Sequence, residues 1–164
     1  ISSKDFNDYI LYRGNYPELK IELDFSEHLI DDSIVPEYGG AIYQEIARII
    51  GSLPSHFCGT MVAHRKRKNC TREQLEEYSG ISISTLQRME TQHEYVNKLE
   101  NIVAVCIALK LYPDFSFDLI DKSNCQFNNM VPHHSAFKMI LRQCFHLSLE
   151  EVNDKLESMK LKTI

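Results

Sequence analysis

Three short groupings of histidine and cysteine raise the question of metal binding. They are His56-x-Cys58, His133-His134 and Cys144-x-His146. Zinc sites built from such side chains need paired C-x-x-C spacing, or two histidines one helical turn apart as in H-E-x-x-H, and none of the three groupings has it. We therefore expect these histidines to be packed or to face solvent, with no bound metal and no cofactor.

Catalytic chemistry has equally little support. No serine or cysteine lies in a nucleophile elbow or another activating motif. Gly39-Gly40 precedes an apolar, helix-forming stretch, but without a glycine-rich phosphate loop it indicates a plain turn. We expect no enzymatic activity within these residues.

A stretch in the middle of the chain has a pattern that suits DNA. Thr71 and Gln74 can form a capping box at the start of a short helix, Gly80 suits a tight turn, and Ser82 can cap a second helix over 83–90. Helical spacing gives the pair a common inner face of Leu75, Ile81, Leu86 and Met89. It leaves an outer face on the second helix, formed by Ile83, Ser84, Gln87 and Arg88. A helix of this kind fits the DNA major groove, with its outer face toward the bases.

This stretch resembles the Cro/lambda-repressor type of helix-turn-helix, often called the XRE family. The resemblance rests on a combination of three patterns: Thr71-x-x-x-Leu75, Gly80-Ile81-Ser82 and Ser84-Thr85-Leu86-x-Arg88-Met89-Glu90. It covers about residues 57–123 and implies a five-helix DNA-binding domain. More weakly, residues 92–160 resemble the helix-turn-helix region that follows an ImmA/IrrE-type metallopeptidase in some bacterial proteins.

The resemblance also implies roles for individual residues. Arg65 and Glu90 lie where the family places an arginine and a glutamate that are commonly ion-paired, so we expect a largely buried pair between them. For DNA, it implies phosphate contacts from Arg72 and Ser82, with Lys98 as a further cation. The residues expected to face the bases are Ile83, Ser84, Gln87 and Arg88. It also implies a homodimer.

Glu76 departs from the family pattern, which has a small residue where the two helices cross closely. A buried, unpaired carboxylate would cost several kcal/mol. Glu76 must therefore reach solvent, find a partner or force the helices apart.

Composition and charge favour a soluble, cytoplasmic protein. The 164 residues are 43% hydrophobic and 25% charged, no apolar run is long enough to cross a membrane, and the five cysteines are scattered. Residues 1–58 carry a net charge of −6, residues 59–124 are balanced and residues 125–164 carry +1. The acidic N-terminal third is therefore a candidate surface for a protein partner.

Apolar spacing divides the chain into three parts. Residues 1–53 are expected to form a small N-terminal extension, and residues 54–124 the five-helix, helix-turn-helix domain. Residues 125–164 are expected to add a helical pair, at about 134–146 and 149–159, packed on this domain. The predicted fold class is therefore mainly α.

Turn and capping residues give the expected boundaries of further elements. In the extension we expect a β-hairpin over 9–25, a loop over 26–37 and a helix from Ala41 to the stop at Gly51. Two more caps are predicted later in the chain. They are Asn97, for the fourth helix of the domain, and Ser148, which forms a capping box with Glu151.

These features together predict sequence-specific DNA binding in transcriptional regulation. The alternative is a protein–protein or regulatory module that keeps the helix-turn-helix scaffold, lacks DNA affinity and is attached to a larger protein such as a metallopeptidase. The position of the positive charges distinguishes the two functions, because a DNA-binding protein needs its cations on one face. The cations in question are residues 65–68, Arg72, Arg88 and Lys98.

Overall fold

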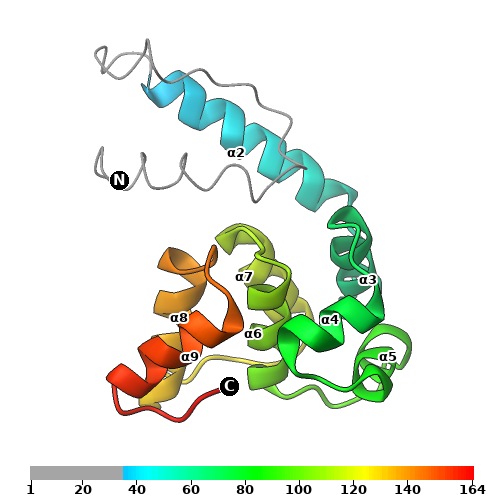
Figure 1. Cartoon of the computed structure of the whole chain (residues 1–164). Helices are drawn as coiled ribbons and strands as arrows, with labels where there is room; N and C mark the ends of the chain where they lie inside the picture. The colour runs from blue at the N-terminus through cyan, green and yellow to red at the C-terminus, as the bar shows by residue number, and fades with distance from the viewer. Residues whose placement is uncertain (1–34) are drawn as a thin grey trace. The chain divides into compact units, whose positions relative to one another are not determined.

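The part of the chain that the structure describes is mainly helical (Figure 1). The structure is a computed structural model that describes residues 35–164, with side chains from residue 43 onward. Within those residues it contains eight α-helices and no strand, which confirms the mainly α prediction. The helices are α2 (Val35–Ser52), α3 (Phe57–Arg67), α4 (Arg72–Ser79), α5 (Ile83–Thr91), α6 (Leu99–Ala108), α7 (Pro113–Lys122), α8 (Pro132–Gln143) and α9 (Leu149–Ser158).

The chain divides into two compact units between Leu53 and Pro54. Of the described helices, α2 belongs to the first unit and α3–α9 make up the second. The β-hairpin expected over 9–25 lies outside the described residues, as does most of the loop expected after it. Over residues 35–164, no helix combines the length and the hydropathy that crossing a membrane requires.

α2 begins earlier than the sequence predicts. The loop expected through residue 37 is wrong at its end, because the helix begins at Val35 and contains both Pro36 and the Gly39-Gly40 pair. Proline is tolerated in the first turn of a helix, where the N–H group that it lacks would have no helical partner. Pro36 therefore lies at the entry to a helix, and the turn predicted at Gly39-Gly40 is wrong, because both glycines are within that helix.

The second unit is built around α6. Residues 102–107 of this helix are all buried, so its surface is apolar on every side. α6 packs against α4, α7, α8 and α9, and in Figure 1 it lies between α4 and α9. One central helix thus joins the predicted helix-turn-helix to the C-terminal helical pair.

The C-terminal pair contributes to this core. Its buried residues are Ala136, Phe137, Ile140 and Leu141 of α8, with Val152 and Leu156 of α9. The capping box of Ser148 and Glu151 is present, as predicted. α8 starts at Pro132 rather than at about 134, again with proline in the first turn.

The predicted cap of α6 is wrong. Lys98, and not Asn97, is the N-cap residue, and it makes no side-chain capping hydrogen bond. The Asn97 amide instead donates from Nδ2 to the Tyr95 carbonyl at 3.4 Å, in the preceding turn. The Asn97 side chain therefore stabilises the turn before α6 and does not cap the helix.

A core substitution in α8 should destabilise the second unit as a whole. Ile140 is fully buried, and we expect Ile140→Val to lower the free energy of unfolding by about 0.5–1.5 kcal/mol in a single transition. Urea unfolding followed by circular dichroism measures this. Met130 is 89% exposed, so Met130→Ala is the control, with an effect below about 0.5 kcal/mol. A separate transition for α8 and α9 would contradict the prediction.

Candidate nucleic-acid interface

α4 and α5 form a helix pair joined by three residues. Thr71 and Gln74 make the predicted capping box at the start of α4. Gly80 ends α4 with a φ of 69°, in the left-handed region that a residue without a Cβ adopts readily. Ser82 then caps α5 by accepting a hydrogen bond from the Thr85 backbone N–H. All three local predictions are confirmed.

The two faces of the pair differ as their spacing predicts. The inner residues Leu75, Ile81, Leu86 and Met89 are all buried. On the outer face Ser84, Gln87 and Arg88 are exposed, and Ile83 is half-buried. No described residue forms an ion pair with Arg88. α5 therefore presents a polar face carrying one cation to solvent.

Arg65 and Glu90 form the expected ion pair. Arg65 donates from Nε to Glu90 Oε1 at 2.5 Å and from Nη2 to Oε2 at 3.2 Å, which is a bidentate contact. Its third nitrogen group, Nη1, donates to the Cys70 carbonyl at 3.0 Å. The Glu90 side chain is 0% exposed and that of Arg65 is 12% exposed. The pair ties the end of α5 to α3 in a site largely closed to water.

Arg72 joins the same carboxylate, which the sequence reasoning missed. Its Nε donates to Glu90 Oε2 at 2.6 Å, and its side chain is 34% exposed. Arg72 lies 18 positions from Glu90 and starts a different helix, so no local spacing could have indicated the contact. Glu90 therefore holds α3, α4 and α5 together.

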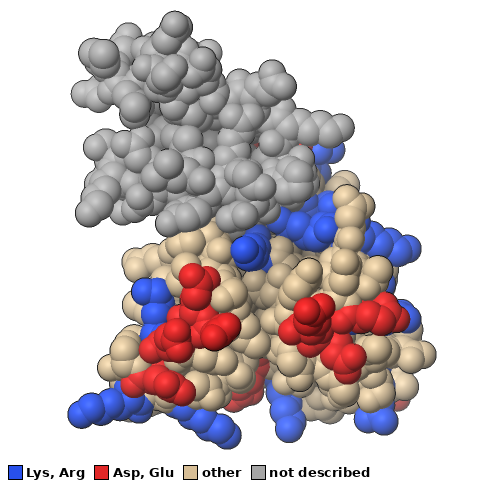
Figure 2. Space-filling view, in the orientation of Figure 1, with Lys and Arg blue, Asp and Glu red and all other residues tan. Residues whose placement is uncertain are grey.

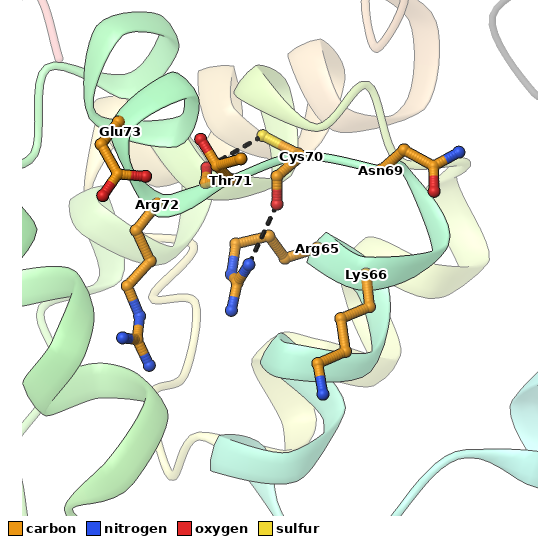
Figure 3. A pocket seen from close by; sticks show the side chains of 7 residues that line it. All are labelled: Arg65, Lys66, Asn69, Cys70, Thr71, Arg72 and Glu73. Carbon is orange, nitrogen blue, oxygen red and sulfur yellow. Dashed lines mark hydrogen bonds between the residues drawn. The ribbon is translucent and has the colours of Figure 1, made fainter.

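A hollow of about 410 Å³ lies along the connection between the end of α3 and the start of α4. Arg65, Lys66 and Arg72 line it, and their side chains extend toward the same side in Figure 3. Asn69 points away from these three in Figure 3, and Glu73 also lines the hollow. The Arg65 guanidinium is already bound to Glu90 and Cys70. Lys66 and Arg72 are therefore the groups on this side that can donate to the oxygens of a phosphate.

Glu76 has found a partner, which is one of the three outcomes that its position allowed. Its Oε1 accepts a hydrogen bond from the backbone N–H of Ile83 at 3.1 Å, and the residue is half-buried. The Ile83 N–H is in the first turn of α5, where backbone donors have no helical partner. Glu76 therefore acts as a second cap of α5, beside Ser82.

The basic run at residues 65–68 does not present four cations to one face. Lys66 is exposed, but Arg67 turns inward, with Nη2 2.6 Å from His64 Nδ1 and the guanidinium 4.7 Å from the centre of the Phe115 ring. Arg67 therefore does not belong to a basic face that could contact DNA. Lys98 is exposed at the start of α6. Figure 2 shows Lys and Arg side chains over α3 and Asp and Glu side chains over α4.

His64 is the buried partner of Arg67. It is 0% exposed, and its ring lies 5.4 Å from that of Phe115 on α7. Nδ1 must accept the hydrogen bond from Arg67, because a guanidinium only donates. Burial, and then the positive charges of Arg67, Lys122 and Lys68, lower the pKa of His64 to about 3. A neutral imidazole therefore joins α3 to α7.

The candidate metal ligands all lie in the part of the chain that the structure describes: His56, Cys58, His133, His134, Cys144 and His146. Among the residues that the structure describes, no group of three or more His, Cys, Asp or Glu side chains is placed to hold a metal ion. His56 and His93 do come together, with ring centres 4.9 Å apart, a pairing that their spacing did not indicate. Burial raises the pKa of the Cys106 thiol to about 12, which makes it inert at neutral pH.

Comparisons with known proteins identify no relative. No family model matches the chain, and no match is found among curated proteins or solved structures. The function of the helix pair is therefore inferred from its residues and their geometry.

Proposed function

We propose that the second unit binds double-stranded DNA, with α5 as the helix that enters the major groove. The observation that carries the proposal is the outer face of α5. It exposes Ser84, Gln87 and Arg88, while the opposite face packs into the core and Glu90 anchors the end of the helix. A helix fixed in this way can offer the same side chains to every binding site, as direct readout of bases requires.

Arg88 and Gln87 supply the specific base contacts in this proposal. An arginine can donate two hydrogen bonds to guanine O6 and N7, and a glutamine can pair with adenine N6 and N7. Ile83 supplies apolar contact with a thymine methyl group, and the Ser84 hydroxyl can pair with several bases. Arg88 is the only one of the four with a charge, so it should contribute most to affinity.

Phosphate contacts come from the residues around α5. Arg72 donates to Glu90 through Nε, and no described residue accepts a hydrogen bond from its terminal nitrogens. Glu90 thus orients the guanidinium and leaves Nη1 and Nη2 for a phosphate oxygen. Lys66, Ser82 and Lys98 are exposed and complete the set. Contacts of this kind position the protein on the duplex without reading its sequence.

Removing the Arg88 side chain is the direct test of α5. We expect Arg88→Ala to weaken binding to a selected DNA site by about 1–3 kcal/mol, because a bidentate base contact is lost. Fluorescence anisotropy across a salt series measures it. Lys66→Ala should weaken all sequences alike and reduce the slope of log affinity against log salt by about one.

Arg142→Ala is the matched control, since Arg142 is an exposed arginine of α8. It removes the same charge away from α5 and should leave specific affinity within about a factor of two. Equal losses for Arg88→Ala and Arg142→Ala would mean that α5 does not read the bases. No binding by the wild-type chain, even at low salt, would contradict the proposal.

Binding to a protein partner is the second candidate function. The outer side of α4 exposes Glu73 and Glu77, together with Tyr78, whose exposed fraction is 50%. Tyrosine is enriched in protein interfaces, and acidic neighbours favour a basic partner. This candidate takes precedence if the wild-type chain fails to bind DNA.

A further inference from the structure

A carboxylate of the chain itself occupies the first turn of each helix of the pair. At α5, Glu76 Oε1 accepts a hydrogen bond from the Ile83 N–H at 3.1 Å. At α4, Glu73 lies in the first turn and is exposed, so its carboxylate adds a negative charge to that end of the helix. The chain thus places a negative charge at the start of each helix, and at α5 it also occupies a backbone donor that could bind an anion.

DNA would come closest to the protein at these same two positions. A recognition helix meets base edges with its N-terminal residues, while the helix before it crosses the sugar–phosphate backbone. Helix N-termini attract phosphates because their free N–H groups and the helix dipole are positive there. A carboxylate on that N–H group removes the donor and adds a negative charge, so it opposes the phosphates.

We infer that Glu76 and Glu73 limit the affinity of α4 and α5 for the DNA backbone. They weaken binding to DNA of any sequence and leave discrimination to the outer face of α5. The inference rests on the proposed function. Glu76 carries more of the effect, because its hydrogen bond and half-burial hold the charge at the end of α5, whereas Glu73 is exposed.

The test compares Glu76→Gln with Glu77→Gln in the full chain. A glutamine oxygen can still accept the hydrogen bond from the Ile83 N–H, so the cap is kept and only the charge is lost. Glu77 is exposed on the same helix, with no hydrogen bond to a described residue. Its substitution changes the net charge by the same amount. The probe is a labelled duplex of mixed sequence, titrated by fluorescence anisotropy at about 50 and 200 mM salt.

We expect Glu76→Gln to tighten binding about fivefold or more at the lower salt, and Glu77→Gln to tighten it less than about twofold, because Coulomb energy falls with distance and screening. The double variant Glu73→Gln/Glu76→Gln should bind more tightly still. The gain should shrink at the higher salt, while an unchanged thermal unfolding midpoint shows that the fold is kept.

The outcomes separate the inference from the proposed function. Binding of all chains with equal gains from Glu76→Gln and Glu77→Gln overturns the inference and leaves DNA binding standing. Binding by the wild-type chain, with a larger gain from Glu76→Gln than from Glu77→Gln, supports both. Binding by Glu76→Gln where the wild-type chain does not bind supports the inference and contradicts the proposed function of the wild-type chain. No binding by the wild-type chain or by any variant at the lower salt overturns both.

Discussion

Glu90→Gln should lower the free energy of unfolding by about 3–5 kcal/mol, which is the usual effect of removing one partner from a buried ion pair. Glu90 is fully buried and accepts hydrogen bonds from both Arg65 and Arg72. Glutamine has nearly the same shape, so the change removes charge and leaves the Arg65 guanidinium enclosed without its counter-charge. Urea unfolding followed by circular dichroism gives the difference.

Two further variants show whether the effect belongs to the buried pair. Arg72→Ala should cost less than about 1 kcal/mol, because the Arg72 side chain is 34% exposed and water screens its charge. Glu100→Gln removes an exposed carboxylate from the first turn of α6. It should lower the free energy of unfolding by less than about 1 kcal/mol. A Glu90→Gln protein as stable as the wild type would show that the pair contributes nothing net to stability.

Acid should destabilise the second unit through His64. The pKa of this buried ring is lowered to about 3, whereas an unfolded histidine has its ordinary value of 6.5. Below pH 6.5 the unfolded chain therefore binds a proton that the folded chain does not, and unfolding becomes easier as the pH falls. The free energy of unfolding should fall by about 1.4 kcal/mol per pH unit, or roughly 5 kcal/mol by pH 3, and level off below that.

The measurement is urea unfolding between pH 5 and pH 7, above the range in which most carboxylates titrate. His64→Gln should flatten the pH dependence in this interval, since an amide oxygen can still accept a hydrogen bond from Arg67 and does not titrate. His93→Gln is the matched control, because His93 is exposed, and it should keep the wild-type slope. A His64→Gln protein with an unchanged slope would place the linked proton on another group.

Protonation of His64 would also break a contact between helices. With a proton on Nδ1 the ring could no longer accept a hydrogen bond from Arg67, and two cations would lie side by side beside Phe115. The contact joins α3, which carries Arg65, to α7. Protonation of His64 in the folded chain would therefore loosen the packing of α3 on α7.

Features that depend on a few neighbouring residues were predictable from the chain. The two capping boxes each span four positions, and the turn at Gly80 needs one residue without a Cβ. The division of α5 into a buried and an exposed face follows from the 3.6-residue period of a helix. The places where local reasoning failed, such as Pro36 and Asn97, are positions where a residue has two local uses and the pattern does not rank them.

Side-chain contacts between helices could not be predicted from local sequence patterns, because they depend on how the helices pack. The pair between Arg65 and Glu90 was expected from a family resemblance, and no spacing rule relates residues 25 positions apart. Three other contacts also join different helices. They are the ion pair of Arg72 with Glu90, the hydrogen bond from Ile83 to Glu76, and the stacking of Arg67 on Phe115. The direction in which a long charged side chain turns is decided by the partner that packing brings within hydrogen-bond reach. Helical periodicity places a residue on a face, but the crossing of α3, α4, α5 and α7 decides whether its charge meets solvent, a carboxylate or an aromatic ring.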